Sequence, residues 1–202
     1  MVLTTGDNIE VSIVVIRPDI AETQRKEQFL DDLRHFCDQN HLKILKIRET
    51  TITLDQIKSH YLTPGKLEEM GGKIIKSIQL ARRDVNLLRK KGLDPANLKA
   101  LGERLMEIEA RTTVGKEKVY VVIAGPNAIS VLFSARGSTD PNQTKPDSFR
   151  GRYGYGTSPA DVVLQEITVA NIVHIPETKE EVIHDFIELG EADYDSFIKQ
   201  YK

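Results

Sequence analysis

Short apolar runs of strand length, rich in β-branched residues, constrain the fold of this chain more than any other feature. Val11–Ile16 stops at Arg17-Pro18-Asp19, and Val119–Ala124 stops at Gly125-Pro126. Each run is about six residues long, which is strand length and far short of the ~20 residues that a membrane helix needs. No basic segment followed by an apolar run lies near Met1, so no signal peptide is expected. The pattern predicts buried strands in a soluble, cytoplasmic protein.

The order of helical and strand patterns predicts the fold class. Helical periodicity covers residues 21–40, a second strand covers 42–53, and a short helix with Thr53 as its N-cap covers 53–61. After the Val119–Ala124 strand come a short helix over 127–133, a β-rich segment over 167–173, and a helix that starts at the capping box of Thr178 and Glu181. The order β-α-β-β-α-β predicts an α+β, ferredoxin-like fold with an antiparallel sheet.

Residues 66–118 are expected to add an αα-hairpin to this single domain. Apolar residues recur at helical spacing from Leu67 to Leu88, and Gly92 ends that run. Asp94-Pro95 then predicts an N-cap and first turn, with a second apolar face from Leu98 to Ile108. The charges on the other faces of these helices are expected to be a solvated surface.

The composition excludes several classes of protein. The chain has 202 residues, a net charge of −2 and one cysteine. A near-neutral charge argues against a dedicated nucleic-acid binder, and one cysteine forms neither an internal disulfide nor a CxxC zinc site. Cys37 follows Phe29 and Leu33 on one helical face, which favours a small core residue over a reactive thiol.

Two features carry candidate chemistry. The long loop from Gly137 to Gly151 contains two prolines and places Arg150 near its end, which leaves a phosphate-binding loop and a plain surface loop both open. His174 ends the last apolar run. A structural role is the more common one for such a histidine, but a nucleophile would need one ring nitrogen free and the other held by an acceptor. Asp185, on the following helix, is a candidate acceptor.

Several short segments together resemble the active-site region of nucleoside diphosphate kinases. They are Gly137-x-Thr139-Asp140-Pro141, Lys145-Pro146-x-Ser148-Phe149-Arg150-Gly151, Asn171-Ile172-Val173-His174, Ile16-Arg17-Pro18-Asp19 and His60-Tyr61. The resemblance covers residues 10–61 and 119–190, and the fold of that family is the one that the pattern predicts.

The resemblance implies that the chain transfers the γ-phosphate of an NTP, typically ATP, to an NDP by a ping-pong mechanism through phosphohistidine at His174. The implied roles are phosphate and sugar contact for Arg17, a place beside the reacting phosphate for Tyr61, phosphate binding for Thr139 and Arg150, sugar binding for Asn171, and orientation of the histidine for Asp185. Mg²⁺ would be held mainly by the nucleotide phosphates, so no protein metal cluster is expected. The expected partners are nucleoside di- and triphosphates and further copies of the chain, in dimer-based tetramers or hexamers, with no membrane or nucleic acid.

The chain departs from the family pattern at the site. Arg17 replaces a lysine, and Phe133 stands where the family has a phosphate-binding arginine, with Arg136 as a candidate replacement. Ile175-Pro176 replaces Gly-Ser, and Asp185 is one methylene shorter than the family's glutamate. No aromatic residue lies between Tyr61 and Tyr120 to stack on a base.

Two alternatives stay open at this stage. The chain could be a nucleotide-binding regulatory or scaffold relative with little or no turnover, in which case the hairpin could be a docking arm for a partner. The short insertion at 153–166, with its Tyr153-Gly154-Tyr155-Gly156, could form a flap or an oligomer contact.

Overall fold

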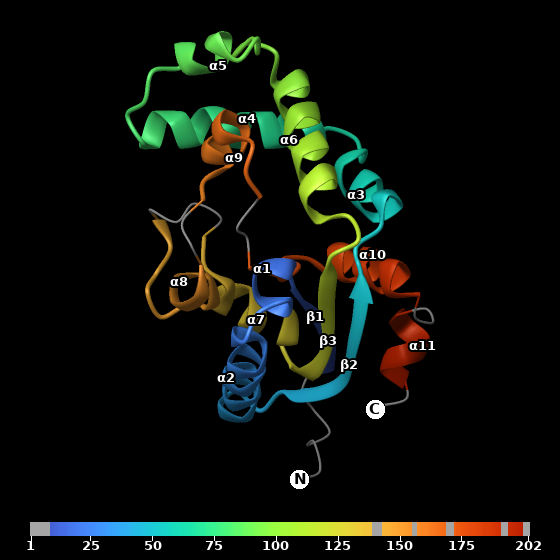
Figure 1. The fold of residues 1–202 in the computed structure, drawn as a ribbon. Coiled ribbons are helices and arrows are strands. Elements are labelled where there is room, and N and C mark those ends of the chain that lie inside the picture. The colour runs from blue at the N-terminus through green and yellow to red at the C-terminus, as the bar shows by residue number, and fades with distance from the viewer. Residues whose placement is uncertain (1–8, 139–142, 155–156, 169–171, 191–193, 200–202) are drawn as a thin grey trace.

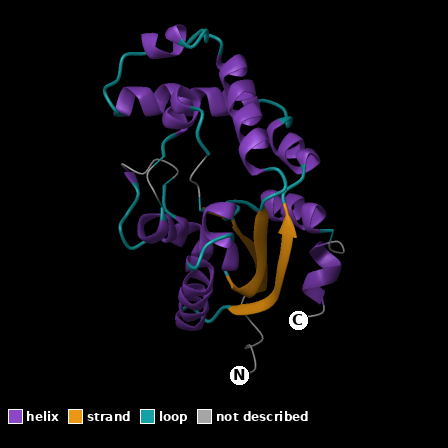
Figure 2. Ribbon diagram, viewed as in Figure 1, coloured by secondary structure: helices purple, strands orange, loops and turns teal. Residues whose placement is uncertain are grey.

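The protein has a four-stranded antiparallel sheet covered by helices, as the computed structural model shows (Figures 1 and 2). The structure describes residues 9–138, 143–154, 157–168, 172–190 and 194–199. The strands are β1 (Ile9–Ile16), β2 (Lys43–Thr51), β3 (Glu117–Pro126) and β4 (Val173–His174), in the order β2-β3-β1-β4. All three pairings are antiparallel, which confirms the ferredoxin-like α+β fold expected from the sequence.

Both faces of the sheet are covered, and this explains why β1 and β3 are apolar along most of their length. One face packs on α1 (Pro18–Ala21), α2 (Arg25–Gln39), α7 (Ala128–Arg136) and α8 (Phe149–Tyr153). The other face packs on α10 (Lys179–Leu189) and α11 (Tyr194–Lys199). Cys37 is buried in the first core, where burial raises the pKa of its thiol to about 12.

A third core lies beyond one end of the sheet, in the upper part of Figure 1. It combines α3 (Leu54–Tyr61), α4 (Lys66–Leu80), α5 (Asn86–Lys90), α6 (Leu98–Thr113) and α9 (Pro159–Gln165). The segment 153–166 therefore contributes a helix to this core, through Ala160, Val162 and Val163. Glu166 adds ion pairs to Arg104 and Arg111 of α6.

Two local expectations about the hairpin were wrong. The first hairpin helix ends at Leu80 instead of Leu88, and Arg82 has a left-handed φ of 51° that separates α4 from α5. Asp94 does not cap α6: its carboxylate accepts a hydrogen bond from the Ala96 N–H in a turn, and the cap is Asn97. Short polar side chains bond to several nearby N–H groups, so the position of a cap cannot be fixed by residue type alone.

At the start of α10, Thr178 accepts from the Glu181 N–H as expected, but Glu181 accepts from the Glu177 N–H and not from Thr178. Among the described residues of the β-rich segment predicted over 167–173, only Val173 lies in a strand, β4, which ends at His174. No helix among the described residues is both long and apolar enough to cross a membrane.

Helices α4 and α6 cross at two glycines. A Cβ atom on Gly71 would lie 2.0 Å from the carbonyl oxygen of Leu98, and one on Gly102 would lie 2.1 Å from that of Leu67. Real Cβ atoms do not approach backbone oxygens so closely, so the crossing requires glycine on both helices. The crossing fixes the position of α6 and, with it, of Glu109, about two turns beyond Gly102.

Replacing Gly71 by alanine should therefore destabilise the protein, whereas the same change at its neighbour Gly72 should not. Gly71→Ala should lower the free energy of unfolding by about 1–3 kcal/mol, because the two helices must move apart. A Cβ on Gly72 has no neighbour within 4 Å, so Gly72→Ala should raise it by roughly 0.5–1 kcal/mol. Urea unfolding followed by circular dichroism measures both values, and equal effects would contradict the close crossing.

Candidate active site

A cavity of about 120 Å³ lies where the third core meets the sheet, and most of the polar side chains of the site line it. Four strand residues, and Arg17 directly after β1, project from the same sheet face. Val15 of β1 pairs with His174 of β4 on one side and with Tyr120 of β3 on the other. Arg17 lies two residues after Val15, and Lys118 lies two residues before Tyr120. Because side chains alternate along a strand, the sheet places Val15, Arg17, Lys118, Tyr120 and His174 on the face that α10 covers. Helices α3, α6 and α10 add His60, Glu109, Asp185 and Glu188.

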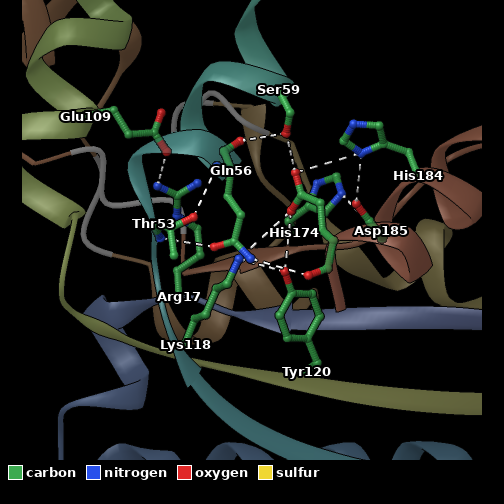
Figure 3. Close-up of polar contacts among 11 residues, drawn as sticks. Arg17, Thr53, Gln56, Ser59, Glu109, Lys118, Tyr120, His174, His184 and Asp185 are labelled. Atoms are coloured by element: carbon green, nitrogen blue, oxygen red, sulfur yellow. Dashed lines mark hydrogen bonds and ion pairs between the residues drawn. The ribbon is translucent and has the colours of Figure 1, made fainter. Parts of the chain in front are cut away.

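His174 is held by Asp185, as the sequence predicted. Its Nε2 lies 3.1 Å from Oδ2 of Asp185 (Figure 3). Burial opposes the charge of this carboxylate, but the charges and hydrogen bonds of His174 and His184 outweigh it and lower the pKa of Asp185 to about 2. An ionised carboxylate accepts only from an N–H, so Nε2 carries the proton. The lone pair of a neutral His174 ring is then on Nδ1.

Arg17 and Tyr61 both donate to one carboxylate, that of Glu109. The Arg17 Nη2 contacts Oε1, and the Tyr61 hydroxyl donates to Oε2 at 2.5 Å. Glu109 is 5% exposed and Tyr61 is 1% exposed. Burial disfavours the charge of Glu109, but the Arg17 charge and the Tyr61 hydrogen bond outweigh it, so the pKa of Glu109 is lowered and the carboxylate is ionised.

Sequence reasoning missed Glu109, since the charged residues of the hairpin were assigned to a solvated surface. A signal was present: Glu109 lies four residues after Leu105, on the face that also carries Leu101 and Ile108. A charged residue on the apolar face of a helix is buried only if it is paired. Its partner, Arg17, is 92 residues away in the sequence, and no local pattern identifies such a pair.

The sequence analysis also did not identify Lys118, a buried lysine of the site. Its Nζ donates to the Tyr120 hydroxyl at 2.6 Å and lies 3.9 Å from Glu188. Burial lowers the pKa of Lys118 to about 8. Gln56 and Ser59 of α3 bond to Glu188, so this helix is tied to α10 around the cavity (Figure 3). The alternation of β3 could have identified Lys118, because it shares a face with Tyr120.

The two predicted phosphate-binding arginines, Arg150 and Arg136, bond to the backbone next to His174. Arg150 donates through Nη2 to the carbonyl oxygen of Val173 at 2.9 Å and through Nη1 to that of Gly137 at 3.2 Å. Burial, with smaller contributions from Arg136 and Arg17, lowers the pKa of Arg150 to about 9. These contacts hold the backbone in place at Val173, directly before His174, and at Gly137, directly after α7.

Arg136 ends α7, and its guanidinium lies over the Phe133 ring at 4.2 Å. It donates to the carbonyl oxygen of Ile175 at 2.9 Å and lines a cavity of about 300 Å³ together with Lys73 and Lys76 of α4. Thr139 and Asn171, the other two predicted substrate-binding residues, lie outside the described residues.

Comparisons with known proteins identify the fold. No protein-family model matches the chain, and no curated protein matches it in sequence. Among solved structures, an NDP kinase from Pyrobaculum aerophilum matches with a TM-score of 0.72 at 20% identity, over 89% of this chain and 94% of that one. A nucleoside-diphosphate kinase from Borrelia burgdorferi, with bound vanadate and ADP, gives 0.60 at 16% identity over 89% and 85%. One from Encephalitozoon cuniculi gives 0.52 at 15% identity over 92% and 91%. The chain therefore has the fold of nucleoside diphosphate kinases.

The Asp185 pair should make stability depend on pH in the acidic range. The pKa of Asp185 falls from its ordinary 3.8 to about 2 on folding, so the unfolded chain binds the proton more readily. The stabilisation is present above about pH 4 and is lost as the pH falls towards 2, with a size on the order of 2 kcal/mol.

Urea unfolding at pH 6 and pH 2.5 measures this effect. Wild type should lose more stability over that interval than Asp185→Asn, which cannot titrate at this position. Asp195→Asn removes a carboxylate whose side chain is 69% exposed, and as the matched control it should follow wild type. Equal losses in wild type and Asp185→Asn would contradict the assignment.

Proposed function

We propose that the chain is a nucleoside-diphosphate kinase, which transfers the γ-phosphate of an NTP to an NDP through phosphohistidine at His174. The observation that carries the proposal is the His174–Asp185 pair at 3.1 Å, at the edge of a cavity that also contains Arg17 and Lys118. A histidine oriented by a carboxylate and placed beside buried cations is suited to accept a phosphoryl group. The fold, shared with the Borrelia enzyme that holds vanadate and ADP, supports the same proposal.

The reaction has two symmetrical halves. In the first, the Nδ1 lone pair of His174 attacks the γ-phosphorus, an N–P bond forms, and the P–O bond to the leaving NDP breaks. In the second, a β-phosphate oxygen of another NDP attacks the phosphohistidine, and the N–P bond breaks. Asp185 keeps the proton on Nε2 and stabilises the positive ring that forms with the N–P bond. The ionised Asp185 therefore matters in both halves.

Phosphoryl transfer depends mainly on positioning and on neutralisation of negative charge. Arg17 and Lys118 supply positive charge inside the cavity, and Arg136 supplies it near the second cavity. Arg150 keeps the chain before His174 in place through the Val173 carbonyl. Tyr61 offers a hydroxyl donor, but in the structure it is engaged by Glu109.

Mg²⁺ is expected to reach the site on the nucleotide. The carboxylates that line the cavity are already paired: Glu109 with Arg17, Asp185 with His174 and Glu188 with Lys118. This donor set fits an ion that is held by phosphate oxygens and water in place of a protein cage. The bound ion would neutralise phosphate charge during transfer.

Labelling with ATP tests the nucleophile. After incubation with γ-labelled ATP, wild type should carry acid-labile, base-stable label, and His174→Ala should carry none. His35→Ala is the matched control, because His35 lies on the exposed side of α2 and bonds only to Gln39 among the described residues; it should label like wild type. Unlabelled wild type, or a labelled His174→Ala, would rule out His174 as the carrier.

A nucleotide-binding relative with little turnover is the second candidate. The engagement of Arg17 and Tyr61 by Glu109, and the place of Phe133 in the sequence motif, favour it. In that case ATP should raise the melting temperature by mass action, while a coupled assay detects no NTP synthesis from ATP and an NDP. Measurable synthesis that disappears in His174→Ala excludes this candidate.

A further inference from the structure

We propose that Glu109 sets the affinity of the site for the transferred phosphoryl group, because its carboxylate competes with phosphoryl oxygens for Arg17 and Tyr61. The inference rests on the proposed function, since it concerns the same cavity. It adds a residue from α6, outside the segments that resemble the kinase motifs, to the determinants of substrate binding.

Arg17, Tyr61 and Glu109 are arranged around one anionic group. The Arg17 guanidinium and the Tyr61 hydroxyl donate to the two different oxygens of one carboxylate. A guanidinium and a hydroxyl that converge on one anionic group form the arrangement that binds a phosphoryl group. Glu109 therefore fills an anion position inside the cavity that His174 also lines (Figure 3).

The charge of Glu109 opposes a second anion in the same cavity. Glu109 is buried and ionised, so it keeps a negative charge within the cavity at neutral pH. A phosphoryl dianion that enters the same space meets this charge where solvent screens weakly. Binding is most favourable only after the carboxylate withdraws from Arg17 and Tyr61.

Arg17 is only partly satisfied by Glu109. Its Nε is buried without a hydrogen-bond partner among the described residues. The Arg17 side chain is 17% exposed, and Glu109 is its one ion-pair partner among the described residues. Glu109 therefore leaves one donor of the Arg17 guanidinium without a partner among the described residues.

The competing interpretation is that Glu109 only holds Arg17 and Tyr61 in position. The two interpretations predict effects of opposite sign when the charge of Glu109 is removed. If the carboxylate competes, an uncharged isostere binds the phosphoryl group more tightly. If it only positions the donors, the same change weakens binding.

Isothermal titration calorimetry of Glu109→Gln distinguishes them. The probes are the β,γ-imido analogue of ATP, which cannot donate its terminal phosphoryl group, and ADP, which lacks that group. Glu109→Gln should bind the imido analogue about tenfold or more tightly than wild type, with a smaller gain for ADP. Glu107→Gln is the matched control: Glu107 is on the same helix, is 61% exposed and pairs with Arg104, so its affinities should stay within about twofold of wild type.

A second variant covers the case in which Glu109→Gln does not fold. Glu109→Asp keeps the charge but is one methylene too short to reach both donors, so a smaller gain of about two- to threefold is expected. If wild type binds both probes and neither variant binds the imido analogue more tightly than wild type does, this inference is overturned. The proposed function is unaffected by that result. If neither wild type nor the variants bind nucleotide, both proposals fail.

Discussion

The buried carboxylate of Glu109 connects three parts of the molecule that the chain brings together from far apart. It joins the end of β1 through Arg17, helix α3 through Tyr61 and helix α6, which carries it. Each charge would be costly to bury alone, and the pair is tolerated because each neutralises the other. The charge of the cavity and the availability of Arg17 both depend on this bridge.

The sheet provides the other fixed element. The pairing of Val15 with both His174 and Tyr120 places a histidine, a lysine and an arginine on one face, under α10. Helix α10 returns Asp185 to His174 eleven residues later. His174, Asp185 and the two cations Arg17 and Lys118 are thus brought together by strand register and helix α10. Arg150, near the end of the long loop, holds the backbone before His174 through the Val173 carbonyl.

How far the sequence could predict this arrangement depended on the range of the interactions. The β1 and β3 runs, the order of elements and the His174–Asp185 pair were predicted, because strand alternation and a strand-to-helix return are local patterns. The ends of α4 and α6 were not, since Arg82 and Asn97 act through backbone conformation and capping bonds that several nearby residues could equally supply. Glu109 was not predicted, because its burial depends on Arg17 and on the Gly71–Gly102 crossing, both remote in sequence.

We infer that Asp185 leaves Nδ1 of His174 as the nitrogen that receives the phosphoryl group. Phosphorus–proton correlation NMR of the phosphorylated, unfolded protein identifies the substituted nitrogen directly, because the two ring isomers of phosphohistidine have different couplings to the ring protons. We expect one phosphohistidine, at position 174, substituted on Nδ1. Phosphate on Nε2, or on any other side chain, would contradict it.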